Sequence, residues 1–376
     1  MKVLAIICSF LFSTISLSGQ SAPDSHSAAG KAAQEDPWAQ LAIATLTFTH
    51  AAELSGLPQS PFLISPFQCT PKGAVFFQIP LPPRFTTRAF VSVTAKGKVT
   101  VNADAANVPG FDEFRQLAVF PRDEHVYGIV EGRYRPPDQL ANGTGEKPPW
   151  GEFVVKYAAA GSIESLIPLT HISFTPTRFA VLPSGRFVLV GKDFTNLAPE
   201  LVMLDASGAN PYPLELFASQ VYSTRELSQF YPGVARDNPA GTGIDRVLSS
   251  VQFVSYGDNV LLVQTGSNFP VAEIGDRGII RTVPLELPAG TTIESLLPSS
   301  QHVLYVRIAD RRAEPPIHRL IVFDPDTGEA LREIKVSGLS SPGLIACESG
   351  NTFLGLGKTF RQGDDSGVWN LMTASE

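Results

Sequence analysis

The sequence predicts an all-β protein, and three observations support that class. Beyond residue 37 the apolar residues form short or alternating runs, and no stretch shows a long 3.6-residue apolar period. Turn-forming residues separate these runs, with 31 glycines and 31 prolines among 376 residues. Only 17% of the residues are charged, which is low for a helix-rich protein. A chain of this length can bury one large β core or two smaller ones.

The runs are organised as a repeated hairpin, in which a strand, a tight turn and a second strand follow one another. The clearest copies are 67–77 and 179–189, whose turns carry Pro, a polar residue and Gly. Four weaker copies are 117–127, 252–261, 295–304 and 345–354. The six turns recur about every 55 residues, a spacing that fits propeller blades.

A second hairpin follows most of the first ones, at 152–169, 200–216 and 318–336. Two hairpins per repeat give four strands per blade. The sequence therefore predicts a β-propeller of six four-stranded blades over residues 60–376, with seven blades as the alternative.

One hairpin, from Leu320 to Val336, carries a family resemblance through its Asp-Pro-Asp-Thr-Gly turn. It resembles the outer hairpin of the YVTN-type and quinoprotein-like β-propeller repeats, and 201–208 is a lesser copy. The resemblance implies a closed ring with a ligand-facing axis, but it implies no single chemistry. The tryptophan motifs of quinone-binding members are absent, so no quinone cofactor is expected.

The N-terminal region predicts export. Residues 1–19 have one early lysine, an apolar run and a small-residue exit, as in a signal peptide. The run is short and interrupted by hydroxyl residues, so it is not expected to remain as a membrane span. A flexible leader is expected at 20–36. The segment 37–59 is a candidate for the strand that closes the ring, with a capped helix as the alternative. The protein is thus expected to be extracytoplasmic, either periplasmic or secreted.

Two cysteines, Cys69 and Cys347, follow the signal segment. Their positions in the first and last repeats suggest neighbouring blades. Aligned on their turns, however, they point to opposite sheet faces, and the innermost strands of adjacent blades are expected to diverge beyond disulfide distance. The sequence therefore predicts two free, largely buried thiols.

Several chemistries find no support in the sequence. The net charge of −7 and the lack of a basic stripe argue against nucleic-acid binding. No compact zinc motif, nucleophile elbow or phosphate loop is present. Asp324, Asp326 and Gly328 fit a capped turn better than a calcium loop, because no distant ligand follows. No metal or cofactor is predicted, and catalytic residues stay unknown.

Long loops are expected on one rim of the ring, between the second and third strands of each blade, at 80–88, 131–150, 191–200, 264–281, 309–319 and 360–367. Function concentrates on such loops. The segments 131–150, 219–246 and 264–281 are expected to be the most mobile. The candidate binding residues on this rim are Arg84, Arg88, Arg133, Tyr134, Arg135, Lys192, Asp193, Arg277, Arg311, Arg312 and Arg361.

Two functions are compatible with these features. The first is a non-catalytic propeller that binds a protein or small ligand on the long-loop rim. The alternative is an extracytoplasmic hydrolase, lactonase-like enzyme or lyase with its site on the axis. Three or more carboxylate, Asn or His side chains converging on the axis would favour the enzyme, and apolar or scattered polar groups there would favour the binder.

Overall fold

A computed structural model describes residues 36–57, 64–69, 73–80, 88–104, 108–123, 125–136, 147–158, 162–193, 199–216, 248, 250–266, 269–339, 343–361 and 364–375. Residues Gln40–Glu376 form one compact unit, separate from Met1–Ala39. The secondary-structure elements of the described residues are strands, and only the isolated positions 248 and 250 are helical. No helix in this part of the chain is long and apolar enough to cross a membrane.

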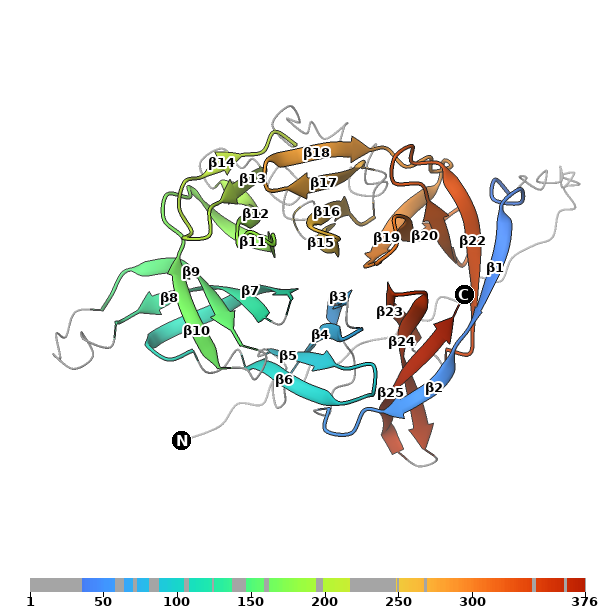
Figure 1. Ribbon diagram of the computed structural model, residues 1–376, viewed down its shortest axis with the longest axis horizontal. Helices are drawn as coiled ribbons and strands as arrows, with labels where there is room; N and C mark the ends of the chain where they lie inside the picture. The colour runs from blue at the N-terminus through green and yellow to red at the C-terminus, as the bar shows by residue number, and fades with distance from the viewer. Residues whose placement is uncertain are drawn as a thin grey trace, which may run out of the picture. The chain divides into compact units, whose positions relative to one another are not determined.

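Six sheets surround a common axis (Figure 1). Apart from two N-terminal strands that pair at outer edges, the strands of each blade follow in chain order from the axis outward. The first three blades consist of β3 (Ile64–Cys69), β4 (Val75–Pro80), β5 (Arg88–Val93) and β6 (Val99–Asp104); β7 (Phe111–Arg122), β8 (His125–Tyr134), β9 (Trp150–Tyr157) and β10 (Ile163–Pro168); and β11 (Phe174–Val181), β12 (Phe187–Asp193), β13 (Pro199–Leu204) and β14 (Tyr212–Pro213).

The other three blades are built in the same way. They consist of β15 (Val251–Tyr256), β16 (Asn259–Gln264), β17 (Val271–Gly275) and β18 (Gly278–Val283); β19 (Thr291–Leu297), β20 (Leu304–Asp310), β21 (Ile317–Phe323) and β22 (Ala330–Ser337); and β23 (Gly343–Ser349), β24 (Thr352–Arg361) and β25 (Asp364–Ser375). The prediction of a six-bladed all-β propeller is confirmed, and the seven-bladed alternative is wrong.

The N-terminal segment completes two blades in succession. Strand β1 (Ala42–Thr47) pairs in parallel with β22 and becomes a fifth strand of the fifth blade. Strand β2 (Thr49–Glu53) then pairs antiparallel with β25 and supplies the fourth strand of the sixth blade. Phe48, between them, donates its backbone N–H to Ser337 O at the end of β22 (2.9 Å) and is buried. We call residues 42–53 the strap.

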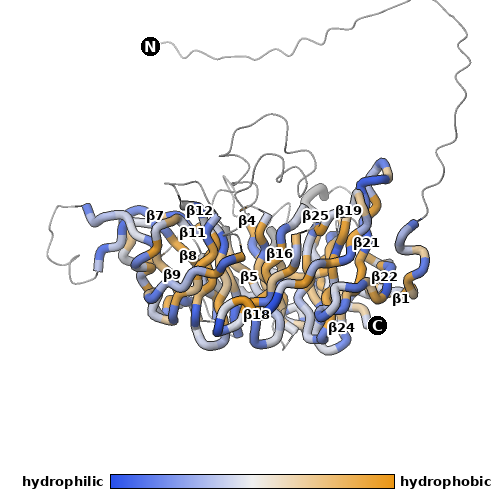
Figure 2. Tube along the Cα trace, turned by 90° about the horizontal axis from the view of Figure 1, so that it is seen from above, coloured by the Kyte–Doolittle hydropathy of each residue, from blue (hydrophilic) through white to orange (hydrophobic). Residues whose placement is uncertain are grey.

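The core lies between the faces of neighbouring blades, as alternation along half-buried strands requires. Apolar residues occupy the middle of the strands, and hydrophilic ones gather at the turns (Figure 2). The innermost strands are less regular than the others. Register shifts interrupt five of the six, namely β3, β7, β11, β19 and β23, whereas β15 pairs without interruption. Such bulges change the direction in which side chains point.

The Asp-Pro-Asp-Thr-Gly segment forms the expected turn between β21 and β22. Asp324 Oδ1 accepts hydrogen bonds from the backbone N–H groups of Asp326 (2.7 Å) and Thr327 (3.0 Å). Gly328 adopts a φ of 77°, which glycine takes without strain. These contacts account for the motif as a turn.

The prediction of free thiols is wrong, because Cys69 and Cys347 form a disulfide with a Cα–Cα distance of 6.0 Å. The turns used to align the two strands differ in length: five residues separate Cys69 from its partner Val75, but only two separate Ser349 from Thr352. A bulge at Ala346 also changes the direction of Cys347. In addition, the innermost strands β3 and β23 approach closely enough for a bridge.

The segment 264–281 is not the long loop that the sequence suggested, because it contains β17 and the first part of β18. The chain there forms the outer hairpin of the fourth blade. The segment 219–246 and the middle of 131–150 lie outside the described residues, so the expectation of mobility is untested there.

Candidate functional site

The predicted rim residues that the structure describes lie on several blades. Arg84 lies outside the described residues, and so do the side chains of Arg88, Asp193 and Arg361. Arg277 is exposed in the turn between β17 and β18, on the opposite rim from the loops that join second and third strands. Lys192 is half-buried on β12.

Three of these residues lie together on the second blade, where they have local partners. The Arg133 guanidinium donates to Pro148 O (2.6 Å) and lies 5.3 Å from the centre of the Trp150 ring. Arg135 pairs with Asp112 at 3.0 Å. The Tyr134 ring packs against Phe111 and Phe153, with ring centres 5.2 and 5.7 Å apart. These contacts give the three residues a structural role.

Two others, Arg311 and Arg312, lie on the fifth blade. Arg312 Nε donates to Asp310 Oδ1 (2.8 Å), and Arg311 Nε donates to Thr292 Oγ1 (3.4 Å). In a six-bladed ring, two blades separate the second from the fifth in either direction. Of the predicted cations whose side chains the structure describes, the pair on the second blade and the pair on the fifth therefore lie apart.

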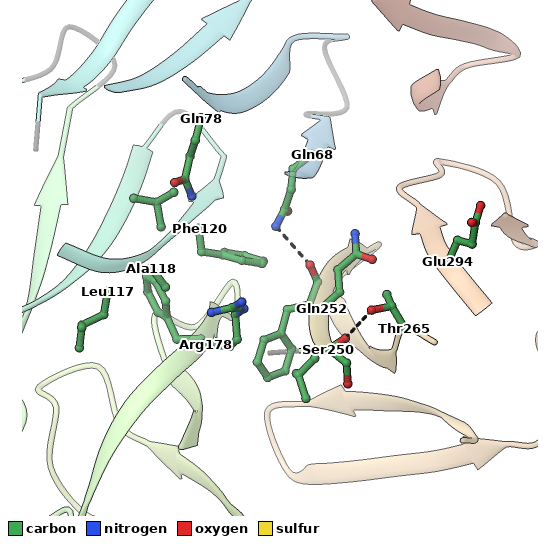
Figure 3. A pocket seen from close by; sticks show the side chains of 14 residues that line it. Gln68, Gln78, Leu117, Ala118, Phe120, Arg178, Ser250, Gln252, Thr265 and Glu294 are labelled. Carbon is green, nitrogen blue, oxygen red and sulfur yellow. Dashed lines mark hydrogen bonds between the residues drawn. The ribbon is translucent and has the colours of Figure 1, made fainter. Parts of the chain in front are cut away.

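A cavity of about 260 Å³ lies among the innermost strands. On each strand its lining residues precede those next to the short turns, so the cavity extends toward the other end of the ring. That end faces the long-loop rim, because every innermost strand starts there. Its walls come from β3, β4, β7, β11, β15 and β19 and from Ser250 and Thr265 next to β15 and β16, so four blades face it with their innermost strands and the fifth with Glu294 (Figure 3). We call it the axial cavity.

Three glutamines line the axial cavity. Gln68 Nε2 donates to Phe253 O (3.3 Å), and its Oε1 accepts from Ser255 Oγ (3.1 Å). Gln78 extends toward the cavity from β4 (Figure 3). Gln252 is only 8% exposed, and its amide makes no hydrogen bond within the part of the chain that the structure describes.

The two charged side chains of the axial cavity both have partners. Arg178 Nη1 donates to Thr177 O (2.8 Å). Glu294 Oε2 accepts from His318 Nδ1 (2.9 Å) and lies 3.0 Å from Arg307 Nε. The remaining wall is apolar and includes Phe120 and Phe179. The cavity is therefore formally neutral, and hydrogen-bonding amides supply its polarity.

A second cavity, of about 340 Å³, lies at the other end of the axis, and we call it the turn-side cavity. It is lined by the C-terminal ends of the innermost strands and by the short turns that follow them, including Arg122, Asp258 and Glu348. The bonds of Gln68 to Phe253 and Ser255 join opposite blades between the two cavities, because Phe253 lines one and Ser255 the other.

The histidines make no common site. His125 pairs with Glu164 (3.2 Å) on the second blade, and His302 Nδ1 lies 2.9 Å from the Tyr256 hydroxyl, between the fourth and fifth blades. Among the described residues, no group of three or more His, Cys, Asp or Glu side chains is arranged to hold a metal ion.

Reasoning from the sequence missed the axial glutamines, because it searched loops and charged residues. A usable signal was present. Gln68, Gln78 and Gln252 each stand in an otherwise apolar innermost or second strand, where an amide has no reason to be buried unless it has a partner.

No family model and no curated protein matches this sequence. Solved structures show similarity at low identity. Regucalcin, a calcium-binding protein from Agrobacterium tumefaciens, matches with a TM-score of 0.42 and 11% identity, over 88% of this chain and 96% of that one. A Trypanosoma rangeli sialidase in complex with sialic acid matches with a TM-score of 0.39 and 10% identity, over 88% of this chain and 59% of that one. The β-propeller domain of the Trilobed protease from Pyrococcus furiosus matches with a TM-score of 0.36 and 10% identity, over 66% of this chain and 64% of that one.

Proposed function

We propose that this protein is an exported, non-catalytic β-propeller that binds a small uncharged polar molecule in the axial cavity, at the long-loop end of the ring. The unpartnered amide of Gln252 carries this proposal. The side chain is only 8% exposed and lines the axial cavity, and its amide atoms are not fully buried, so water or a ligand in the cavity can bond with them. A ligand that bonds to Gln252 gains a hydrogen bond that the protein itself does not supply.

The chemistry of the walls narrows the ligand. Each glutamine amide offers both donors and an acceptor, which suits hydroxyl groups that do the same. Phe120 and Phe179 add apolar surface beside them. Since Arg178 and Glu294 already have partners, a formal charge on the ligand gains little. A volume of about 260 Å³ lies just below the usual range of about 300–1,000 Å³ for ligand sites, which limits the ligand to the size of a polyol or a single sugar ring.

The axial cavity offers little for catalysis. Of the described residues that line it, Glu294 is the one carboxylate and is held by His318 and Arg307, and none is Asn or His. Its wall of apolar groups and scattered amides favours a binder over an enzyme. The turn-side cavity has three carboxylates, but Glu348 is engaged by the turns and Asp123 and Asp258 are exposed, and the three are not arranged to hold a metal ion. The Cys69–Cys347 disulfide supports export, because such bonds persist in oxidising compartments.

Isothermal titration of the protein with a panel of polyols and monosaccharides tests the proposal. Gln252→Leu should weaken binding at least about tenfold, the loss that corresponds to 1.4 kcal/mol. Its thermal stability should stay the same or rise, because leucine needs no partner. Gln116→Leu is the matched control, since Gln116 lies on β7 outside the cavity lining and should bind normally. Equal affinities for the two variants would contradict the site.

A further inference from the structure

The Cys69–Cys347 disulfide places its two sulfurs in different surroundings. Cys347 is 0% exposed and belongs to the apolar core that includes Leu354, Leu356 and Leu371. Cys69, at the end of β3, packs against the same core but is only half-buried and also lines the turn-side cavity, whereas Cys347 is not part of that lining. A small molecule that enters the turn-side cavity therefore reaches Cys69 and not Cys347.

The turn-side cavity presents mainly negative charge to an entering molecule. Its one cation, Arg122, is only 8% exposed and donates to Gly257 O (3.2 Å). The carboxylates of Asp123 and Asp258 are exposed at the mouth. Positive charge on the molecule should therefore assist its entry.

The third carboxylate of the turn-side cavity is already engaged. Glu348 is buried and accepts hydrogen bonds from Ser299 Oγ (2.8 Å), Ser300 N (2.9 Å) and Asn351 N (2.8 Å). It fixes the turns around the mouth, so the cavity beside Cys69 is held open by a rigid frame.

We propose that Cys69 is a site of reversible thiolation, at which a small thiol, preferably a cationic aminothiol, exchanges with the disulfide through the turn-side cavity. The thiolate attacks Cys69 Sγ and forms a new S–S bond with it. The bond between Cys69 and Cys347 breaks, and its electron pair leaves on Cys347 Sγ, which takes up a proton. The entering thiol is oxidised and Cys347 is reduced, so no other oxidant or reductant takes part.

The ring keeps its outer closure during this exchange. The pairing of β2 with β25 holds the sixth blade independently of the disulfide. Cys347 therefore stays beside Cys69, and its thiol expels the adduct when the free thiol is removed. The modification changes the inner junction of the first and sixth blades and leaves the fold in place.

The test incubates the folded protein with cysteamine or with 2-mercaptoethanesulfonate, quenches with acid, and maps adducts by mass spectrometry. We expect a single adduct on Cys69, with Cys347 alkylated only after unfolding. Per thiolate, cysteamine should react about fivefold faster at low salt, and the difference should shrink as salt is added. An adduct on Cys347, equal rates for the two thiols, or no reaction of the folded protein would each overturn the proposal.

A pair of variants separates entry through the cavity from exchange by unfolding. Asp258→Trp narrows the mouth and should slow adduct formation about fivefold or more. Glu329→Trp changes another exposed acidic turn residue, outside the lining, and should react at the original rate. Equal rates for the two variants would show that the thiol reaches Cys69 by another route and would overturn the proposal.

Discussion

Gly328, in the turn between β21 and β22 of the fifth blade, lies so close to the carbonyl oxygen of Pro284 that a Cβ atom has no room there. Pro284 directly follows the outermost strand of the fourth blade. The third blade repeats this arrangement, because Gly208 lies against the carbonyl oxygen of Pro168 at the end of β10. The outer turns thus set the spacing between neighbouring blades.

Gly328→Ala should therefore destabilise the ring more than an equivalent change at an open turn. Gly350 is the matched control, with a φ of 57° and no other atom within 4 Å of the position that a Cβ would take. Gly350→Ala should cost about 1–2 kcal/mol for the backbone alone. Gly328→Ala should cost about 1–3 kcal/mol more because its neighbour must move. Urea unfolding of both variants measures the difference in their free energies of unfolding. Equal losses of stability would contradict the idea that the contact of Gly328 with Pro284 sets the spacing of the blades.

Replacing both cysteines by serine should lower the free energy of unfolding substantially. The disulfide closes a loop with a sequence separation of 278 residues. For a loop of that size the chain-entropy model gives about 5 kcal/mol. The check is urea unfolding of the double variant beside the oxidised protein. A loss below about 1 kcal/mol would show that the unfolded chain is not constrained in this way.

Phe48 should be the most sensitive residue of the strap. Its ring lies against Gly355 in the sixth blade, and its backbone bonds to Ser337 in the fifth. Phe48→Ala should cost about 3–5 kcal/mol, as other buried phenylalanines do. Ile43→Ala, at a side chain that is 57% exposed, should change stability by less than about 0.5 kcal/mol. Thermal unfolding of the two variants measures these losses of stability. Similar losses in both would mean that Phe48 does not join the blades.

Glu152 should make stability depend on pH near neutrality. Burial raises the pKa of this β9 carboxyl from 4.5 to about 7, despite a hydrogen bond from Thr175 that lowers it. The pKa of this carboxyl is higher in the folded protein than in the unfolded chain, so folding favours its protonated form. The contribution of this carboxyl to stability is therefore complete below pH 4.5 and is lost as the pH rises through about 7. Unfolding free energies at about pH 5 and about pH 8 should differ less in Glu152→Gln than in the original protein. If the stability of Glu152→Gln changed between these two pH values as much as that of the original protein, Glu152 would not be the group responsible.

Local patterns predicted the blades because each inner hairpin carries its own turn residues and apolar strands. The same reasoning failed at 264–281, where charged residues suggested a loop. On an outer hairpin one face of each strand meets solvent, and charges there pair across strands, as Arg281 Nε and Glu273 Oε2 do at 2.7 Å. Charge in such a segment marks an exposed face of a strand as readily as a loop.

The site was harder to predict because its residues come from different blades. Gln68 and Gln252 are 184 positions apart, and the contact of Gln68 with Phe253 arises only when the ring closes. The disulfide could not be predicted because it requires a bulge and two turns of different length. The pattern of apolar and polar residues along a strand reveals neither feature. Long-range juxtaposition of this kind is decided by ring geometry and not by local sequence.

The strap also has a consequence for the order in which the protein can be completed. Thr49 and its partner Thr373 are 324 positions apart, so β2 is among the first strands synthesised and can pair only after the last strand is complete. Until the end of the chain is available, a segment rich in alanine and threonine has no partner strand. Pairing over such a distance is slow, because loop closure precedes any gain from contacts. The interval before closure is therefore when this protein is most exposed to aggregation.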